Sequence, residues 1–219
     1  MAISGTYDYF KVQAKFAMQE LEKYFHDSKV EILHQFRVEL KKIRAIFFHL
    51  EEMPDQKQVK KLHRQIKKIF RKAGEIRELQ LELAWLEKHR KFNLIRLMQY
   101  ESTLRKSDKH FHRGIPFMLD TFKKVCRKTE HRLSMLTQQQ TNQYISKKWQ
   151  AVLHPLLSSI EEKCWHKTRK GVKQLVYARH WISADTILQK KVISIFHSLD
   201  KLQNAIGKWH DLDLLATKI

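Results

Sequence analysis

The chain has 219 residues, enough to bury a substantial core as one large domain or two small ones. Its 5 glycines and 3 prolines are too few for the many tight turns of an all-β fold. Its 43 lysines and arginines outnumber 23 aspartates and glutamates, which leaves a formal net charge of +20. Because self-repulsion at this charge opposes compaction, we expect a polyanionic partner rather than only a solubilising surface.

Apolar residues recur at helical spacing along nearly the whole chain, which predicts an all-α protein. The predicted helices span residues 7–27, 30–52, 55–73, 75–91, 93–107, 115–139, 141–160, 162–182 and 185–217. Pro54 separates the second helix from the third. Gly74 is expected to interrupt its helix as either a bend or a C-cap, and Gly207 to interrupt the last helix in the same way. Gly114 is expected to open a helix after a basic loop at 110–113. No segment has the composition of a linker, so we expect one compact unit.

The two cysteines, Cys126 and Cys164, have neither metal-binding nor redox spacing. Both lie among apolar residues of helical period, so we expect reduced core thiols, as in the cytoplasm. The first residues lack the apolar core of a signal peptide, and no run approaches the ~18 apolar residues of a spanning helix. The sequence therefore predicts a cytoplasmic protein that does not cross a membrane.

A pattern of residues occurs twice in the chain. His-x-x-Arg-x-x-x-Lys starts at His34 in HQFRVELKKIR and again at His166 in HKTRKGVKQLVY, 132 residues later. Downstream, the segment GEIRELQ at Gly74 matches GKWHDLD at Gly207, 133 residues later. Two matches at nearly one offset indicate a duplicated helical unit with pseudo-two-fold symmetry. Two basic helices would then face one shared space.

Basic residues form a stripe along each of three predicted helices. On helix 30–52, four residues fall within an arc of about 80°: His34, Arg37, Lys41 and Arg44. On helix 55–73, eight cations share one side, and no acid lies between Asp55 and Glu75: Lys57, Lys60, Lys61, Arg64, Lys67, Lys68, Arg71 and Lys72. On helix 162–182 the stripe contains His166, Arg169, Lys173 and Tyr177, with Lys170 at its margin and Glu162 nearby.

These stripes have the chemistry of a phosphate-binding surface. Arginine grips phosphate oxygens with a planar fork, lysine adds a compact cation, and histidine and tyrosine donate further hydrogen bonds. Like charges one helical turn apart destabilise a helix, and a bound polyanion would remove that penalty. A linear phosphate chain matches a row of cations spaced by helical turns. The alternative is three independently solvated basic faces.

The repeated segments resemble those of a known family. HQFRVELKKIR and HKTRKGVKQLVY are similar to the two signature helices of the CHAD domain, the conserved histidine α-helical domain. GEIREL and GKWHDLDLL resemble the Gly-containing segments that follow those helices in the family. The similarity extends from about residue 10 to the C-terminus, and the order and spacing of the motifs are more specific than any one of them.

The resemblance implies a single domain over residues 1–219, with halves of about 1–110 and 111–219. It implies two pseudo-symmetric four-helix bundles with a basic central channel that binds inorganic polyphosphate, without catalysis, cofactor or metal. It also implies a cytoplasmic location and association with polyphosphate granules. The expected channel residues are His34, Arg37, Lys41, Arg44, Arg64, Lys68, Arg71, His166, Arg169, Lys170, Lys173 and Tyr177.

The sequence departs from the family pattern at several positions. Val176 stands where the second signature usually has arginine, so one phosphate contact is missing or supplied elsewhere. Glu78 replaces the usual aspartate in the first half. The last helix of the second bundle is expected to be short or absent, and residues 110–160 match no part of the pattern. We therefore expect the second bundle to be completed differently, or by another chain.

Three other functions remain open. Nucleic acid would satisfy the same cations, although most aromatic residues, such as Phe70, are expected in the core rather than exposed for base stacking. A metal-dependent phosphohydrolase is the second alternative, since His210-Asp211 with Asp213 resembles an HD-type ligand pair. Arg77-Glu78, at the matching position of the first half, carries no such pair. Binding to a membrane surface is the least favoured, because the apolar faces are needed for the core.

Overall fold

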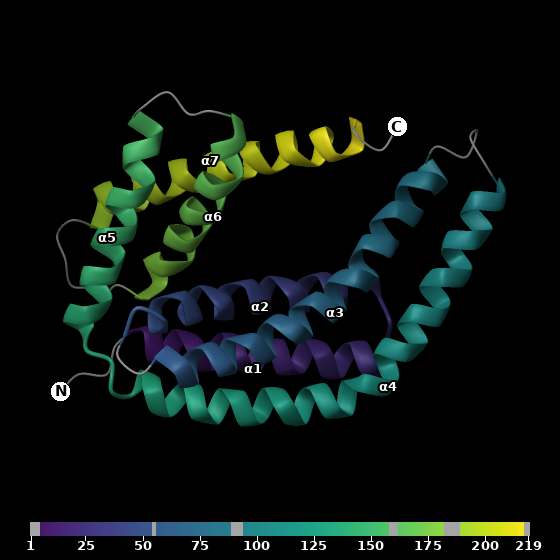
Figure 1. Cartoon of the computed structure of the whole chain (residues 1–219), viewed down its shortest axis with the longest axis horizontal. Coiled ribbons are helices and arrows are strands. Elements are labelled where there is room, and N and C mark those ends of the chain that lie inside the picture. Colours follow the sequence, from purple (N-terminus) through teal and green to yellow (C-terminus); the bar gives the residue numbers. More distant parts are fainter. Residues whose placement is uncertain (1–4, 54–55, 89–93, 158–161, 182–188, 217–219) are drawn as a thin grey trace. The chain divides into compact units, whose positions relative to one another are not determined.

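The structure, a computed structural model, describes residues 5–53, 56–88, 94–157, 162–181 and 189–216. Within these ranges the chain is helical and contains no strand, which confirms the predicted all-α helical bundle (Figure 1). The α-helices are α1 (Gly5–His26), α2 (Val30–Leu50), α3 (Gln56–Lys88), α4 (Leu94–Leu133), α5 (Gln138–Leu157), α6 (Glu162–Ala178) and α7 (Gln189–Ala216). A short 3-10 helix, η1 (Arg179–Trp181), follows α6. Pro54, the predicted break between the second and third helices, lies outside the described residues.

At the two glycines of the repeat the predicted helix end is wrong, whereas the alternative, a bend within a continuous helix, stays a prediction. α3 continues through Gly74, and α7 continues through Gly207. A glycine inside a helix costs about 1 kcal/mol relative to alanine, which is small enough for packing along the helix to offset. Around Gly74 the neighbours Ile69, Ala73 and Ile76 are buried, so the apolar face of α3 is continuous across the glycine.

The predicted loop before Gly114 is also wrong. α4 runs through residues 110–113 and Gly114 without a break, and Pro116 lies inside it. Proline removes a backbone donor and disfavours the interior of a helix. Core packing outweighs this cost, because the side chains of Phe111, Ile115 and Phe122 are almost completely buried on either side of the proline.

The chain divides into two compact units, which we call the 10–132 unit and the 133–219 unit; residues 1–9 belong to the second. The 10–132 unit contains most of α1, the helices α2 and α3, and nearly all of α4. The 133–219 unit contains α5, α6, η1 and α7. The prediction of a single domain with halves that meet near residue 110 stays a prediction.

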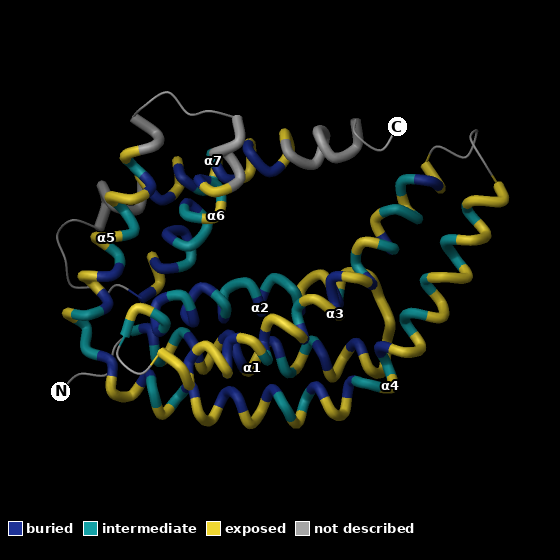
Figure 2. Tube along the Cα trace, viewed as in Figure 1, coloured by how far each residue is buried: buried dark blue, intermediate teal, exposed yellow. Residues whose placement is uncertain are grey.

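Apolar stripes fill the core of the 10–132 unit. Figure 2 shows buried and exposed positions alternating with helical period along α1 and α4. On α2 the side chains of Phe36, Leu40, Ile43 and Phe47 are fully buried. Cys126 is a buried free thiol, as predicted, and burial raises its pKa to about 12. This packing leaves the opposite, basic faces of α2 and α3 free for another role.

A separate apolar cluster forms the core of the 133–219 unit. It joins α5, α6 and α7 through Val152, Val172, Leu175, Val176, Phe196 and Leu199. Val176, which stands where the family pattern has arginine, is therefore a core residue. The side chain of Cys164 lies outside the described residues.

In the described part of the chain, no helix combines the length and the apolar character needed to cross a membrane.

Candidate anion-binding site

Two arginines of α2 converge on one aromatic ring of α3. The guanidinium carbon of Arg37 lies 4.5 Å from the centroid of the Phe70 ring, and that of Arg44 lies 4.6 Å from it. A cation over an aromatic face at this distance gains about 0.5–2 kcal/mol, depending on its desolvation. Phe70 is only half-buried. Its predicted place in the core is therefore incomplete: the ring also supports two charged side chains.

Arg37 is held by contacts with the backbone of α3 as well. Its Nη1 donates a hydrogen bond to the main-chain oxygen of Phe70, at 3.2 Å. The same nitrogen lies so close to Gly74 that a Cβ on that residue would overlap it. The ring, the carbonyl and the bare glycine backbone together fix the position of the guanidinium.

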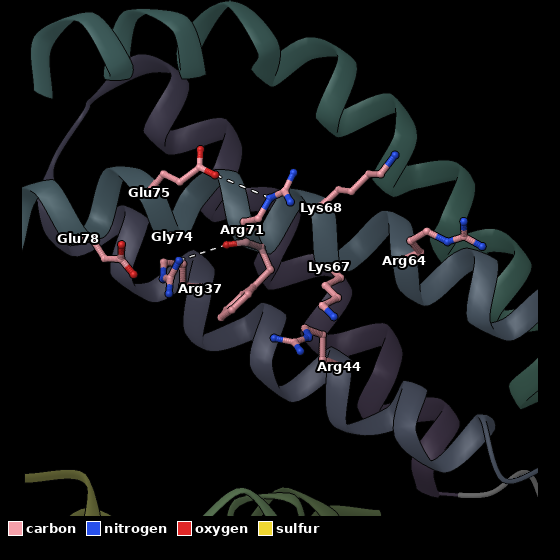
Figure 3. Close-up of a pocket in the computed structure, with 10 residues that line it drawn as sticks. Arg37, Arg44, Arg64, Lys67, Lys68, Arg71, Gly74, Glu75 and Glu78 are labelled. Carbon is pink, nitrogen blue, oxygen red and sulfur yellow. Dashed lines mark hydrogen bonds and ion pairs between the residues drawn. The ribbon is translucent and has the colours of Figure 1, made fainter. Parts of the chain in front are cut away.

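The two arginines form one side of a pocket of about 500 Å³. Arg64, Lys67, Lys68 and Arg71 from α3 complete the basic lining. Figure 3 shows Lys67 extending toward Arg44, and Lys68 extending away from it. Phe70, Gly74 and two acids, Glu75 and Glu78, complete the lining. Six basic side chains from two helices thus gather around one space.

Two of the six cations of the pocket, Arg37 and Arg44, are partly buried, and burial affects both guanidinium groups. Burial lowers the pKa of the Arg44 guanidinium, and it also lowers the pKa of Arg37. Arginine stays protonated despite such shifts, so the pocket keeps positive charges that water solvates poorly. The Nε of Arg44 is buried and has no hydrogen-bond acceptor among the described residues. An anion in the pocket would supply the missing acceptor and the missing counter-charge.

The two acids balance only part of this charge. Glu75 lies 3.8 Å from the Nε of Arg71, in a pair exposed to solvent on both sides. The negative charge of Glu78 acts on Arg37 against the effect of burial and raises its pKa. Glu78 lies inside α3 and acts on Arg37 through its charge.

His34 and Lys41, the other predicted residues of the α2 stripe, do not line this pocket. His34 is exposed, one helical turn before Arg37. Burial of part of its ring lowers the pKa of His34, and the charges of Arg77, Lys41 and Arg37 lower it further. His34 therefore lies within electrostatic reach of the same cations and would become easier to protonate beside an anion.

Five of the seven residues predicted in this half line the pocket: Arg37, Arg44, Arg64, Lys68 and Arg71. The prediction left out Lys67, although it lay on the predicted basic side of its helix. It also left out Phe70 and Gly74, because apolar period assigned the first to the core and the second to a helix break. The recurrence of Gly74 in the repeat was the one signal that could have drawn attention to it.

The 133–219 unit repeats the contact between arginine and glycine. A Cβ on Gly207 would lie 2.7 Å from the Nη2 of Arg169. The Nε of Arg169 is buried and, like that of Arg44, has no acceptor among the described residues. Lys173 and Tyr177 are half-buried on the same helix, and Lys170 is exposed. The side chain of His166 lies outside the described residues.

The proposed metal-ligand pair of a phosphohydrolase also falls outside them. The side chains of His210, Asp211 and Asp213 are not among those described. Elsewhere, the described residues contain no group of three or more His, Cys, Asp or Glu side chains placed to hold a metal ion.

Comparison with known proteins agrees with the repeated motifs. The family model of the CHAD domain matches residues 14–219, nearly the whole chain. Searches of the curated proteins and of the solved structures found no match to this chain. The family as a whole is associated with polyphosphate binding. Since the matched region includes both signature helices and both glycine segments, the chain belongs to the CHAD domain family.

Proposed function

We propose that this protein binds inorganic polyphosphate without chemically changing it, and that the pocket between α2 and α3 is a principal binding site. The observation that carries the proposal is the convergence of six basic side chains on one pocket, with Arg37 and Arg44 held over Phe70. The family's general association with polyphosphate supports the same ligand.

The row of cations on α3 suits a linear phosphate chain. Arg64, Lys67, Lys68 and Arg71 lie at successive turns of one helix face and span about 10 Å along its axis, at a rise of ~1.5 Å per residue. A ligand with a negative charge on every phosphoryl group can engage all of them at once. Arg37 and Arg44 approach the same space from α2 and offer guanidinium forks, which match phosphate oxygens in geometry.

The two guanidinium groups over the Phe70 ring favour polyphosphate over nucleic acid as the ligand. Proteins that hold single strands without sequence preference usually stack bases on aromatic rings between their cations. Phe70 is the aromatic residue of this pocket, and two guanidinium groups already lie over its ring. A base would have to displace a favourable cation–π contact to stack there, whereas a phosphate chain would bind to the guanidinium groups as they stand.

The proposal extends to the basic face of α6. Following the family pattern, we infer that His166, Arg169, Lys170, Lys173 and Tyr177 bind the same class of ligand, in a central basic channel. The half-buried Arg169, with an Nε that lacks an acceptor among the described residues, supports this extension. We also propose a cytoplasmic role, at polyphosphate granules or in solution.

The test is a titration of the full chain with long-chain polyphosphate, duplex DNA and single-stranded RNA at two salt concentrations. The test variant is Arg37→Ala/Arg44→Ala. The matched control is Arg113→Ala/Arg127→Ala, which also removes two arginines, from exposed positions of α4 in the same unit. Both variants lose the same net charge, so a general electrostatic effect would weaken them equally.

We expect polyphosphate to bind more tightly than either nucleic acid, and the test variant alone to lose most of that affinity. Equal losses in the two variants would mean that the cations act as a diffuse surface, and the pocket would be the wrong site. Tighter binding of RNA or DNA would identify a nucleic-acid-binding protein instead. Release of inorganic phosphate from the bound chain would overturn the non-catalytic part of the proposal.

A further inference from the structure

Gly74 and Gly207 share a geometry that their backbone does not require. Both lie inside long α-helices, and neither has a backbone φ in the left-handed region that favours glycine. Each therefore weakens its helix relative to alanine without any gain in turn formation. A reason for glycine at these positions has to come from what lies against them.

An arginine guanidinium lies against each of these glycines. At Gly74, the three atoms nearest to a built Cβ all belong to the guanidinium of Arg37. At Gly207, they all belong to Arg169, with Nη2 at 2.7 Å and Cζ at 3.3 Å. A methyl group at either position would have to push the arginine away. The same contact thus occurs in both units, between the same two motifs of the repeat.

The other helical glycines of the described chain show what is particular to this pair. At Gly114 of α4 a Cβ would meet only Met118 Cε at 3.7 Å, an ordinary contact with room to spare. At Gly171 of α6 a Cβ would lie 2.7 Å from Val152 Cγ2, so that glycine serves packing in the core. Only the two glycines of the repeat, among those described, face a guanidinium.

We propose that Gly74 and Gly207 are positioning residues for the anion site, and this inference rests on the proposed function. Each bare stretch of helix backbone is a seat for one arginine. A guanidinium has five N–H donors, and the seat together with the Phe70 carbonyl occupies one edge of Arg37. The remaining donors are then held ready for phosphate oxygens, so binding loses less side-chain freedom.

In this chain the seats link the two segments of each repeat. The arginine of His-x-x-Arg lies against the glycine of the segment that follows. Loss of the glycine would leave the charge unchanged but let the arginine swing away from Phe70. The glycines therefore affect affinity through orientation, and the net charge of the site is not altered by their replacement.

The test is a double-mutant cycle between Gly74→Ala and Arg37→Ala, with Gly114→Ala as the matched helix-interior control. For each variant we would measure polyphosphate affinity and the midpoint of thermal unfolding. We expect Gly74→Ala to lose about tenfold in affinity in the wild-type background and to have no further effect in the Arg37→Ala background. Gly114→Ala should bind as the wild type does.

A spectroscopic readout separates positioning from general damage. Arg37 lies over the Phe70 ring, so its Nε–Hε resonance in an NMR spectrum of the free protein should carry a ring-current shift. Gly74→Ala should remove that shift, and Gly114→Ala should leave it unchanged. The corresponding pair, Gly207→Ala with Arg169→Ala, repeats the affinity cycle in the other unit.

The outcomes are distinguishable. Normal binding and an unchanged Arg37 resonance in Gly74→Ala would overturn the seat, while a loss of binding in Arg37→Ala would still uphold the proposed function. Normal binding in Arg37→Ala would instead contradict the proposed function. If Gly74→Ala lowers the unfolding midpoint, the double variant should recover it, because Arg37→Ala removes the clashing group. Failure to recover would show that Gly74 serves packing alone.

Discussion

The two basic helices, α2 and α6, share the motif His-x-x-Arg-x-x-x-Lys but differ in the residues that follow it. Both place an arginine against a glycine of a following helix, Arg37 on Gly74 and Arg169 on Gly207. Seven residues after that arginine, α2 has Arg44 over an aromatic ring, whereas α6 has Val176 inside the apolar core. Both units therefore keep the contact between arginine and glycine, together with the histidine and lysine of the motif. The second arginine belongs to one unit only.

The partner of that second arginine has changed together with it. At the offset that relates the two glycines, Phe70 corresponds to Gln203, which is buried and donates to Asp200 and Asn204. The 133–219 unit thus lacks both Arg44 and the ring that supports it. The arginine that α6 lacks and the ring that α7 lacks are in contact in the 10–132 unit.

The row of cations on α3 has been diluted as well. At the same offset, Lys67 corresponds to Asp200 and Arg71 to Asn204. An acid and an amide thus occupy places where the 10–132 unit has two cations of its pocket. The two segments of the repeat thus differ in charge, and we expect the 10–132 unit to bind anions more strongly.

The largest expected loss of polyphosphate affinity comes from removing the two arginines of α2 in the 10–132 unit. Arg37→Ala/Arg44→Ala should weaken polyphosphate binding by about 100-fold, since each arginine provides charge-assisted hydrogen bonds worth about 1.5–3 kcal/mol before compensation. Arg169→Ala/Lys173→Ala, with the same loss of charge, should weaken it by only about tenfold. Both would be measured by titration at one salt concentration. Equal losses would mean that the two units contribute alike, against the comparison above.

A smaller effect is expected from the aromatic platform alone. Phe70→Leu keeps an apolar side chain but removes the ring face, so two cation–π contacts of about 0.5–1 kcal/mol each are lost. Because these contacts exist in the free protein, we expect a lower unfolding midpoint, and about fivefold weaker polyphosphate binding because the two arginines are held less firmly for the ligand. The matched variant Gln203→Leu changes the corresponding position of α7 and should bind normally. Unchanged binding in Phe70→Leu would show that the ring is only a core residue.

Much of this site could be predicted from helical period and the repeat. The stripe on α2 and the basic side of α3 follow from spacing alone, because charges that share a helix face recur at three and four residues. Which stripe residues share a pocket could not be derived, because it depends on how α2 packs against α3. Arg37 and Arg44 reach the pocket, and His34 does not line it.

The errors have a common physical origin. Gly74 and Gly207 were interpreted as breaks, and Phe70 as a core residue, from the local preferences of each residue type. In the structure all three lie against an arginine of another helix, more than 30 positions away in sequence for Phe70 and Arg37, and local preferences cannot predict such a contact. Pro116 shows the same rule, since tertiary burial of its neighbours overrides the preference of proline.

Glu78 offers a change in the opposite direction. The Glu78 side chain lines the pocket, and its negative charge acts on Arg37. The same charge repels an anion that enters the pocket. Glu78→Gln should strengthen polyphosphate binding by about threefold, a gain expected for removal of one partly solvated like charge. Glu87→Gln, an exposed acid on the same helix that does not line the pocket, is the control. A loss of affinity in Glu78→Gln would mean that Glu78 orients Arg37 rather than competing with the ligand.

The smallest effect concerns the pH dependence of binding through His34. Burial and three neighbouring cations lower the pKa of His34 in the free protein, and a bound polyanion would raise it. The bound state then takes up a proton, so affinity rises as pH falls through the bound-state pKa and levels off below the free-state pKa. The gain is expected to be about twofold to threefold between neutral pH and the lower limit.

Substitution of His34 separates this linkage from other titrating groups. His34→Gln should flatten the pH profile of polyphosphate affinity, because glutamine keeps a polar side chain that cannot be protonated. His110→Gln removes an exposed histidine of α4 and should keep the wild-type profile. An unaltered profile in His34→Gln would place the ligand out of reach of the first turn of α2. The residues of α2 that bind the ligand would then be those that line the pocket, Arg37 and Arg44.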